Sequence, residues 1–176
     1  APGDPMETRS CLRYLVRRSQ PAYLRLGKAG ERVFHSQPPE VSPGSVVCVR
    51  RSPEAETGKK ALLTTGGGLG VAMNACERFP KGGAWSVYSM PLWSEGSRET
   101  IREFVARRNA VIVLEDHLPA GGFGSFVRES LGQNGDLQKR VCCMSLDARV
   151  CDRVGRQEFL HRQGGLSPEA VASSMA

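Results

Sequence analysis

Three polar residues with the potential for acid–base chemistry stand side by side in the chain. Glu115, Asp116 and His117 directly follow a short, largely β-branched apolar run at residues 111–114. A carboxylate beside a histidine can orient or polarise the imidazole, and α/β folds place ligands at the carboxyl ends of buried strands. Glu115 and His117 are therefore the candidate catalytic residues. The alternative is that these polar groups serve only in hydrogen bonds of a loop.

Glycines cluster at two points where a strand is expected to turn into a helix. The clusters read Gly-Gly-Gly-Leu-Gly from residue 66 and Gly-Gly-Phe-Gly from residue 121. The free N–H groups of a helix N-terminus can bind phosphate or another small anion, which makes Gly67, Gly68, Gly122 and Gly124 the candidate anion-binding residues. The alternative is that a tight turn needs glycine for its backbone geometry and close packing. Neither cluster completes a dinucleotide or phosphate-loop motif.

Strand and helix patterns alternate after residue 44. Strands are expected at residues 46–49, 61–65, 85–90, 111–114 and 140–144, and helices at 69–79, 97–108, 121–131, around 152–161 and from 167 onward. This alternation predicts an α/β fold, a three-layer sandwich with about five mostly parallel strands. A short polar turn at residues 52–59 joins the first two strands, which is compatible with an antiparallel pair.

The first part of the chain has a different character. A helix is expected from about residue 5 to residue 18, followed by a short strand around Tyr23, Leu24 and Leu26. Residues 35–44 are rich in proline and serine, which is typical of a linker. One helix and one strand are too little for a domain. This part must therefore pack on something else. A resemblance of residues 20–28, given below, implies that residues 1–38 are the tail of a preceding domain plus linker and that residues 39–176 form the main domain.

Composition narrows the class of partner. The formal net charge is +6, but the basic residues are scattered without a run of five and without interleaved aromatic residues. A nucleic-acid partner is therefore not expected.

No apolar run reaches the length of a membrane span and no signal peptide is visible, which favours a cytoplasmic location without membrane contact. The six cysteines lack zinc-type spacing, so no metal site is expected and most should be buried apolar residues.

Residues 111–131 carry a resemblance to a known family. Their sequence, Val-Ile-Val-Leu-Glu-Asp-His-Leu-Pro-Ala-Gly-Gly-Phe-Gly-Ser-Phe-Val-Arg-Glu-Ser-Leu, resembles the signature of the C-terminal domain of the transketolase and deoxyxylulose-phosphate synthase family. In that family a buried strand ends in Glu-Asp/Glu-His/Asn, and a Gly-Gly-x-Gly-Ser turn opens the next helix. Residues 61–66, 87–91 and 164–171 resemble further family segments in the same order. Residues 20–28 resemble the last strand of the preceding pyrimidine-binding domain.

The resemblance implies a cofactor that other domains hold. Enzymes of this family use thiamine diphosphate and a divalent metal, Mg²⁺, to transfer a two-carbon keto unit, and the cofactor supplies the difficult chemistry. The family's Gly-Asp-Gly diphosphate motif has no match here, and its glutamate that activates the cofactor would lie well before Pro21, outside this chain. No cofactor is therefore expected in this chain alone. The expected partners are the remaining domains or a subunit of such an enzyme, and a homodimer is expected.

The resemblance also points to a substrate contact. When the sequences are aligned on Pro21, a family position that helps to bind substrate phosphate falls on Lys28, and Arg25 lies three residues earlier. Transketolases and deoxyxylulose-phosphate synthases tend to have arginine at the later position. Lysine supplies a point charge there instead of the bidentate hydrogen-bond donor that arginine provides, so the match to the family position is incomplete.

Three functions are compatible with the sequence. The favoured hypothesis is a C-terminal domain or subunit of a transketolase-like transferase that serves packing and dimer assembly and is inactive alone. The second is a regulatory module that binds a small anion at a glycine turn. The third is an independent enzyme that uses Glu115 and His117, which would require a pocket within this chain.

Overall fold

A five-stranded sheet forms the centre of the protein, and a computed structural model describes residues 1–28, 30–52, 59–79 and 84–175. The strand order is β1-β3-β2-β4-β5. Strands β2, β3, β4 and β5 pair in parallel, and β1 pairs with β3 antiparallel. The strands are β1 Val47–Arg50, β2 Lys60–Thr65, β3 Trp85–Ser89, β4 Ala110–Glu115 and β5 Val141–Met144. The predicted α/β class and the mostly parallel sheet are confirmed.

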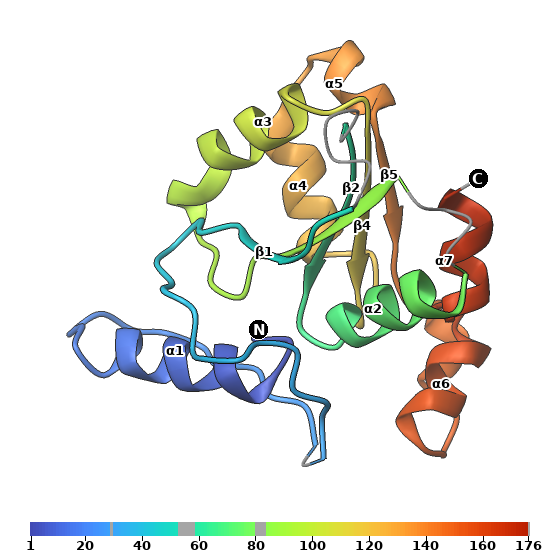
Figure 1. Cartoon of the computed structure of the whole chain (residues 1–176), viewed down its shortest axis with the longest axis horizontal. Helices are drawn as coiled ribbons and strands as arrows, with labels where there is room; N and C mark the ends of the chain where they lie inside the picture. Colours follow the sequence, from blue (N-terminus) through green and yellow to red (C-terminus); the bar gives the residue numbers. More distant parts are fainter. Residues whose placement is uncertain (29, 53–58, 80–83, 176) are drawn as a thin grey trace.

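Helices cover both faces of this sheet (Figure 1). One face packs against α3 and α4, and the other against α2 and α7, so that two separate apolar cores lie on the two sides. The helices are α1 Pro5–Leu15, α2 Gly68–Arg78, α3 Arg98–Ala106, α4 Phe123–Leu131, α5 Gly135–Lys139, α6 Gln157–Gln163 and α7 Pro168–Met175, with short 3₁₀ turns at Glu95–Ser97 and Ala148–Val150. The three-layer sandwich is therefore confirmed.

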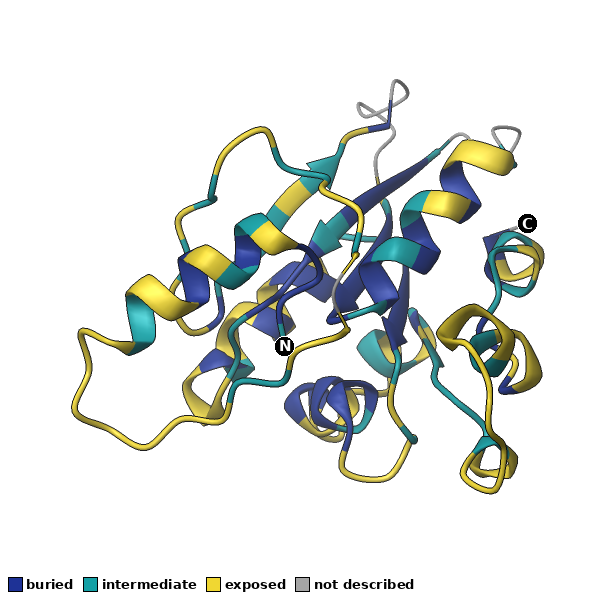
Figure 2. Ribbon diagram, turned by 90° about the horizontal axis from the view of Figure 1, so that it is seen from below, coloured by how far each residue is buried: buried dark blue, intermediate teal, exposed yellow. Residues whose placement is uncertain are grey.

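The central strand β4 is buried on both faces, as its continuous apolar run predicts. Val111 and Val113 point into the core with α3 and α4, while Ile112 and Leu114 point into the core with α2 and α7. Figure 2 shows the strands as a buried centre within a more exposed shell of helices. Because side chains alternate along a strand, the next two residues of the chain must also diverge toward opposite layers.

Three expectations differ from the structure. β1 pairs with β3 and not with β2, since β3 lies between the first two strands in the sheet. The expected turn between them falls largely on residues 53–58, which lie outside the described residues. The expected strand around Tyr23–Leu26 does not form, because no neighbouring strand in the described chain offers it hydrogen bonds. Of the cysteines, Cys48, Cys142 and Cys151 are exposed rather than buried.

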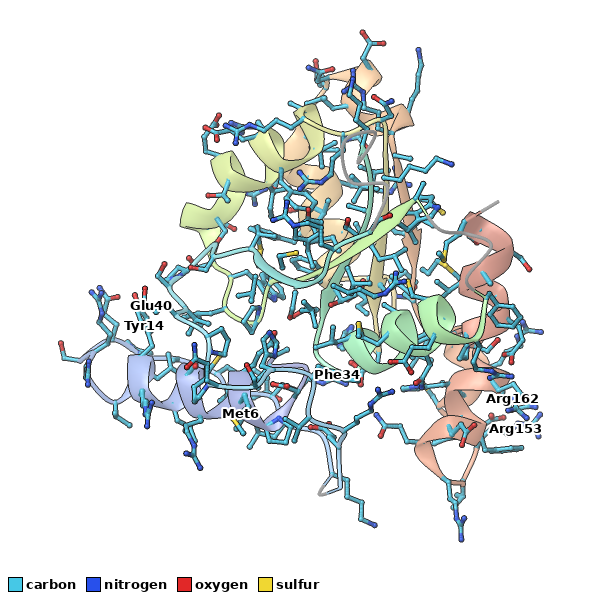
Figure 3. All side chains as sticks on the ribbon, in the orientation of Figure 1. Met6, Tyr14, Phe34, Glu40, Arg153 and Arg162 are labelled. Atoms are coloured by element: carbon cyan, nitrogen blue, oxygen red, sulfur yellow. The ribbon has the colours of Figure 1, made fainter. Side chains whose placement is uncertain are left out.

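Residues 1–35 lie across the carboxyl ends of β2 and β3. The carbonyl oxygen of Ala1 accepts hydrogen bonds from Gly66 N, at 2.8 Å, and from Thr65 Oγ1, at 3.2 Å. Phe34 packs against the core of the α2 face, and Figure 3 shows it between α1 and α2. Helix α1 itself extends away from the sheet (Figure 1). The N-terminal segment is thus attached at Ala1, at the buried start of α1 and around Phe34, while the far end of α1 is exposed at Leu12 and Val16.

A buried polar cluster makes this attachment. Asp4 caps α1 through Glu7 N at 2.8 Å and also accepts from Phe34 N and from the amide and ring of His35. Glu7 accepts from Gly3 N at 2.6 Å and from Ser89 Oγ on β3 at 3.0 Å. Both carboxyl groups are fully buried. Residues from the start of α1, from the segment at residue 35 and from β3 therefore meet around two carboxylates.

Burial raises the pKa of Glu7, against the opposing effect of its hydrogen bonds. A raised folded-state pKa gives stability that is complete below the ordinary carboxyl pKa and is lost as pH rises through the folded value. We therefore expect Glu7→Gln to gain stability relative to the wild type as pH increases from about 4 to 8. Denaturant unfolding at several pH values measures this difference. Glu40→Gln, at an exposed position, should show no such trend, and an equal trend in both variants would contradict the expectation.

Candidate functional site

A cavity of about 530 Å³ opens at the carboxyl ends of the parallel strands. This is the edge of an α/β sheet at which ligands bind. Its walls come from α1 and the extended segment after it, from the connection after β3, and from the end of β4 with the glycine turn that follows. Representative lining residues are Tyr14, Arg18, Tyr23, Arg25, Pro91, Trp93, Glu115, His117, Gly122 and Phe123.

Glu115 ends β4 and is bound by the N-terminus of α4. Its Oε2 accepts from Phe123 N at 2.5 Å, and its Oε1 accepts from Gly124 N at 2.8 Å. The side chain is buried, and this burial raises the pKa of Glu115 although the two N–H groups oppose the change. A carboxylate at a helix N-terminus satisfies otherwise unpaired donors and complements the helix dipole. The geometry therefore gives Glu115 a structural task at the edge of the cavity.

The same contact explains the second glycine cluster. A Cβ atom at Gly122 would overlap Glu115 Oε2, and one at Gly124 would lie 3.0 Å from Glu115 Oε1. These residues are glycine because the carboxylate approaches the backbone so closely. The anion at this turn is thus the chain's own Glu115, and an external anion would have to compete with it for the N–H groups of Phe123 and Gly124.

Asp116 points to the opposite side of β4 and holds Arg25. Arg25 Nη1 donates to Asp116 Oδ1 at 2.7 Å, and Arg25 Nη2 donates to the Asp116 carbonyl oxygen at 2.8 Å. The hydrogen bond to the Asp116 carboxylate raises the pKa of the Arg25 guanidinium. The contact connects the extended segment after α1 with the end of the central strand, 91 residues later in the chain.

The first glycine cluster lies against this second carboxylate. A Cβ atom at Gly67 would lie 2.7 Å from Asp116 Oδ2, and one at Gly68 would lie 2.6 Å from the carbonyl oxygen of Leu114. Gly66 has a positive φ of 56°, which favours glycine. Its N–H group is already bonded to Ala1 O. Close packing and turn geometry therefore explain this cluster as well.

Helix α2 provides a matched pair of glycine substitutions. Gly68→Ala places a methyl group against the backbone of Leu114, so we expect a loss of about 1–3 kcal/mol in the free energy of unfolding. Gly70 has nothing within 4 Å of a Cβ position, so Gly70→Ala should gain about 0.5–1 kcal/mol. Chemical denaturation measures both. Equal effects of the two changes would show that close packing does not determine the glycine at residue 68.

His117 and Lys28 occupy different surroundings. His117 is exposed at the cavity edge, and its Nδ1 lies 2.9 Å from the carbonyl oxygen of Leu118. Lys28 is exposed and is not among the residues that line the cavity, whereas Arg25 is. The structure thus brings Arg25, Glu115 and His117 to one cavity and leaves Lys28 outside it. Which of them contact a substrate stays a prediction.

The structural task of Glu115 can be measured by truncation. Glu115→Ala leaves two buried N–H groups without an acceptor, so we expect a loss of about 1–3 kcal/mol in the free energy of unfolding. Glu129→Ala, on the exposed face of the same helix α4, should change stability by no more than about 0.5 kcal/mol. Thermal and denaturant unfolding provide the measurement. Unchanged stability of Glu115→Ala would favour a role in chemistry alone.

Several residues that line the cavity could not be identified from the sequence. Trp93 lines it and stacks on Phe126, with ring centroids 5.0 Å apart. Tyr14 reaches it from α1. Both come from segments that only the tertiary structure brings to the end of β4. The role of Asp116 had a signal in the sequence, because alternation along β4 places it opposite Glu115 and beside the other glycine turn.

Across the described ranges, no group of three or more His, Cys, Asp and Glu side chains is placed to hold a metal ion. The carboxylates nearest the glycine turns already bond to the N–H groups of α4 and to Arg25. These two carboxylates therefore do not fit as ligands of a metal ion in this arrangement. None of the described helices has both the length and the apolar character to cross a membrane.

Comparison with known proteins assigns the chain to a family. A family model described as transketolase, C-terminal domain, matches residues 53–171. The chain belongs to this family, in agreement with the resemblance of residues 111–131.

Individual relatives are considerably longer than this chain. A 1-deoxy-D-xylulose-5-phosphate synthase from Thermus thermophilus is 30% identical over 178 residues, which cover 100% of this chain and 27% of the relative. A subunit of an apulose-4-phosphate transketolase from Actinobacillus succinogenes is 27% identical over 136 residues, which cover 77% of this chain and 42% of the relative. The chain thus spans about a quarter of the synthase and less than half of the transketolase subunit.

A solved structure shares the fold of nearly the whole chain. It is described as a split gene transketolase in an inactive beta4 tetramer, and it superposes with a TM-score of 0.79 at 23% identity. The superposition covers 99% of this chain and 55% of the other. The shared fold therefore includes the N-terminal segment as well as the sheet.

Proposed function

We propose that this chain is the C-terminal part of a transketolase-like transferase that moves a two-carbon keto unit with thiamine diphosphate and Mg²⁺ held elsewhere in the complete enzyme. Its own contribution is packing and assembly, including the contacts of a homodimer, and it has no turnover alone. Membership in the transketolase C-terminal family supports this proposal. The lack of a metal-binding cluster among the described residues is compatible with a cofactor site in other domains.

The observation that carries the packing role is the exposed apolar surface of the N-terminal segment. Leu12, Val16, Tyr23, Leu26 and Val33 are five of the seven exposed large apolar residues among those described. Tyr23 is 86% exposed and Leu26 is 54% exposed. Large apolar side chains left exposed in one segment favour an interaction site there.

The backbone of the same segment supports this interpretation. Its sequence predicts a strand around Tyr23–Leu26, yet the structure gives it no strand partner among the described residues. An extended segment with free N–H and C=O groups can join the edge of another sheet. We propose that residues 1–38 complete the pyrimidine-binding domain that the family resemblance implies, and that residues 39–176 form the C-terminal domain.

The cavity supplies the second part of the proposal. The names of the synthase and of the transketolase subunit both contain a sugar phosphate, and Arg25 presents a guanidinium to the cavity. We propose that a phosphate group of the substrate contacts Arg25 rather than Lys28. The alternative of an anion-binding module at the glycine turns receives less support, because Glu115 and Asp116 of this chain already lie against those turns.

Association is tested with the polypeptide that carries the cofactor-binding domains in the same organism. We expect a complex that binds thiamine diphosphate in calorimetry, whereas this chain alone shows no binding heat. Combining Tyr23→Ser with Leu26→Ser should weaken the complex at least about tenfold, because two large apolar side chains no longer become buried.

Val154→Ser is the matched control, because Val154 is 98% exposed and lies outside the N-terminal segment. It should leave the affinity of the complex unchanged. Tight binding of thiamine diphosphate to the isolated chain would contradict the proposal. Equal affinity of the wild type and the Tyr23/Leu26 double variant would contradict the proposed packing surface.

A further inference from the structure

The contact between Arg25 and Asp116 fixes a cation at the wall of the cavity. Both terminal nitrogens of the guanidinium donate to one residue, at 2.7 Å to the carboxylate and 2.8 Å to the carbonyl oxygen. The side chain of Asp116 is only 9% exposed, while that of Arg25 is 37% exposed. The buried partner is therefore the anchor, and the more exposed guanidinium is what it orients.

The guanidinium of Arg25 has further N–H donors beyond the two that bond to Asp116. Arginine has five N–H donors in a planar fork, and the structure uses two of them for Asp116. Three remain on a group that lines the cavity. An arginine held in one orientation loses less freedom when it binds a phosphate group, which it recognises through paired hydrogen bonds.

The position of Asp116 is itself fixed by the fold. It follows the last residue of the buried strand β4, and Gly66 and Gly67 pack against its carboxylate, where Cβ atoms would lie 3.1 and 2.7 Å from its two oxygens. The absence of side chains at these two residues gives the carboxylate its space. A movement of Asp116 would therefore require a movement of the sheet edge or of the glycine turn.

We infer that Asp116 is a positioning residue that holds Arg25 in the orientation required to bind a phosphate-bearing ligand in the cavity. Asp116 acts through Arg25 and does not touch the ligand. This inference rests on the proposed function, because it assumes the phosphate contact of Arg25 and adds the residue that orients it.

Electrostatic repulsion alone predicts the opposite effect of Asp116 on phosphate affinity. A carboxylate beside a phosphate site repels the anion, so its removal should tighten binding. A positioning residue has the reverse effect, because its removal frees the arginine to adopt many rotamers. The sign of the change in phosphate affinity therefore distinguishes the two roles.

The test measures binding of inorganic phosphate to this chain. Trp93 lines the cavity, whereas Trp85, the other tryptophan, is buried and bonds through its indole N–H to Met175 O. Intrinsic fluorescence and calorimetry should both report phosphate binding, and the fluorescence change should vanish in Trp93→Phe. We expect Asp116→Ala to weaken binding about tenfold and Asp116→Asn, which retains an acceptor oxygen, to weaken it less.

Two controls complete the design. Asp147 forms an exposed pair with Arg149 at 2.9 Å, and it does not line the cavity. Asp147→Ala should therefore leave phosphate affinity unchanged. Arg25→Gln should remove most of the binding, and adding Asp116→Ala to Arg25→Gln should have no further effect, because a residue that acts through Arg25 has nothing left to orient. Circular dichroism confirms folding of each variant, and Asp116→Asn carries the test if Asp116→Ala unfolds.

The possible failures are distinguishable. Phosphate affinity that depends on Arg25 but is unchanged or tighter in Asp116→Ala and Asp116→Asn would overturn the positioning role and leave the proposed phosphate contact intact. Phosphate affinity that is independent of Arg25, or no binding at all, would overturn both. NMR relaxation of the Arg25 Nε–H group gives a readout without ligand: it should be rigid in the wild type and mobile in Asp116→Ala.

Discussion

Two consecutive carboxylates at the end of β4 hold the functional edge of this protein together. Alternation along the strand sends Glu115 to the layer of α3 and α4 and Asp116 to the layer of α2. Glu115 binds the first N–H groups of α4, and Asp116 lies against the turn before α2 and binds Arg25. The end of this one buried strand therefore determines three features: the two glycine clusters, the starts of two helices and the attachment of the N-terminal segment.

This arrangement changes how the glycine-rich turns are understood. Such turns commonly bind anions through helix N-termini, and here the chain supplies a carboxylate to each. Both carboxylate oxygens of Glu115 accept from backbone N–H groups, whereas Asp116 accepts from the guanidinium of Arg25, which lines the cavity. The two turns are thus alike in sequence and packing, but they differ in what the neighbouring carboxylate offers to a ligand.

Much of the sheet could be predicted from the sequence, because local patterns determine it. The apolar run before Glu115 indicates a strand buried on both faces, and the alternation with helices indicates parallel pairing. The neighbour of β1 could not be predicted, since loop length alone does not fix sheet order. The strand expected at Tyr23 did not form, because a strand needs a partner as well as a suitable sequence. The cluster of Asp4, Glu7 and His35 depends on contacts that a local pattern does not encode.

The way in which residues 1–35 are attached also has a consequence for the order of folding. Three of their partners, Gly66, Ser89 and Asp116, come from three different strand ends and lie 65 to 91 residues away in the chain. Closing such long loops costs entropy that single contacts do not recover. We therefore expect strands β2, β3 and β4 to align before the segment docks, and the cavity, which this segment helps to enclose, to be completed last.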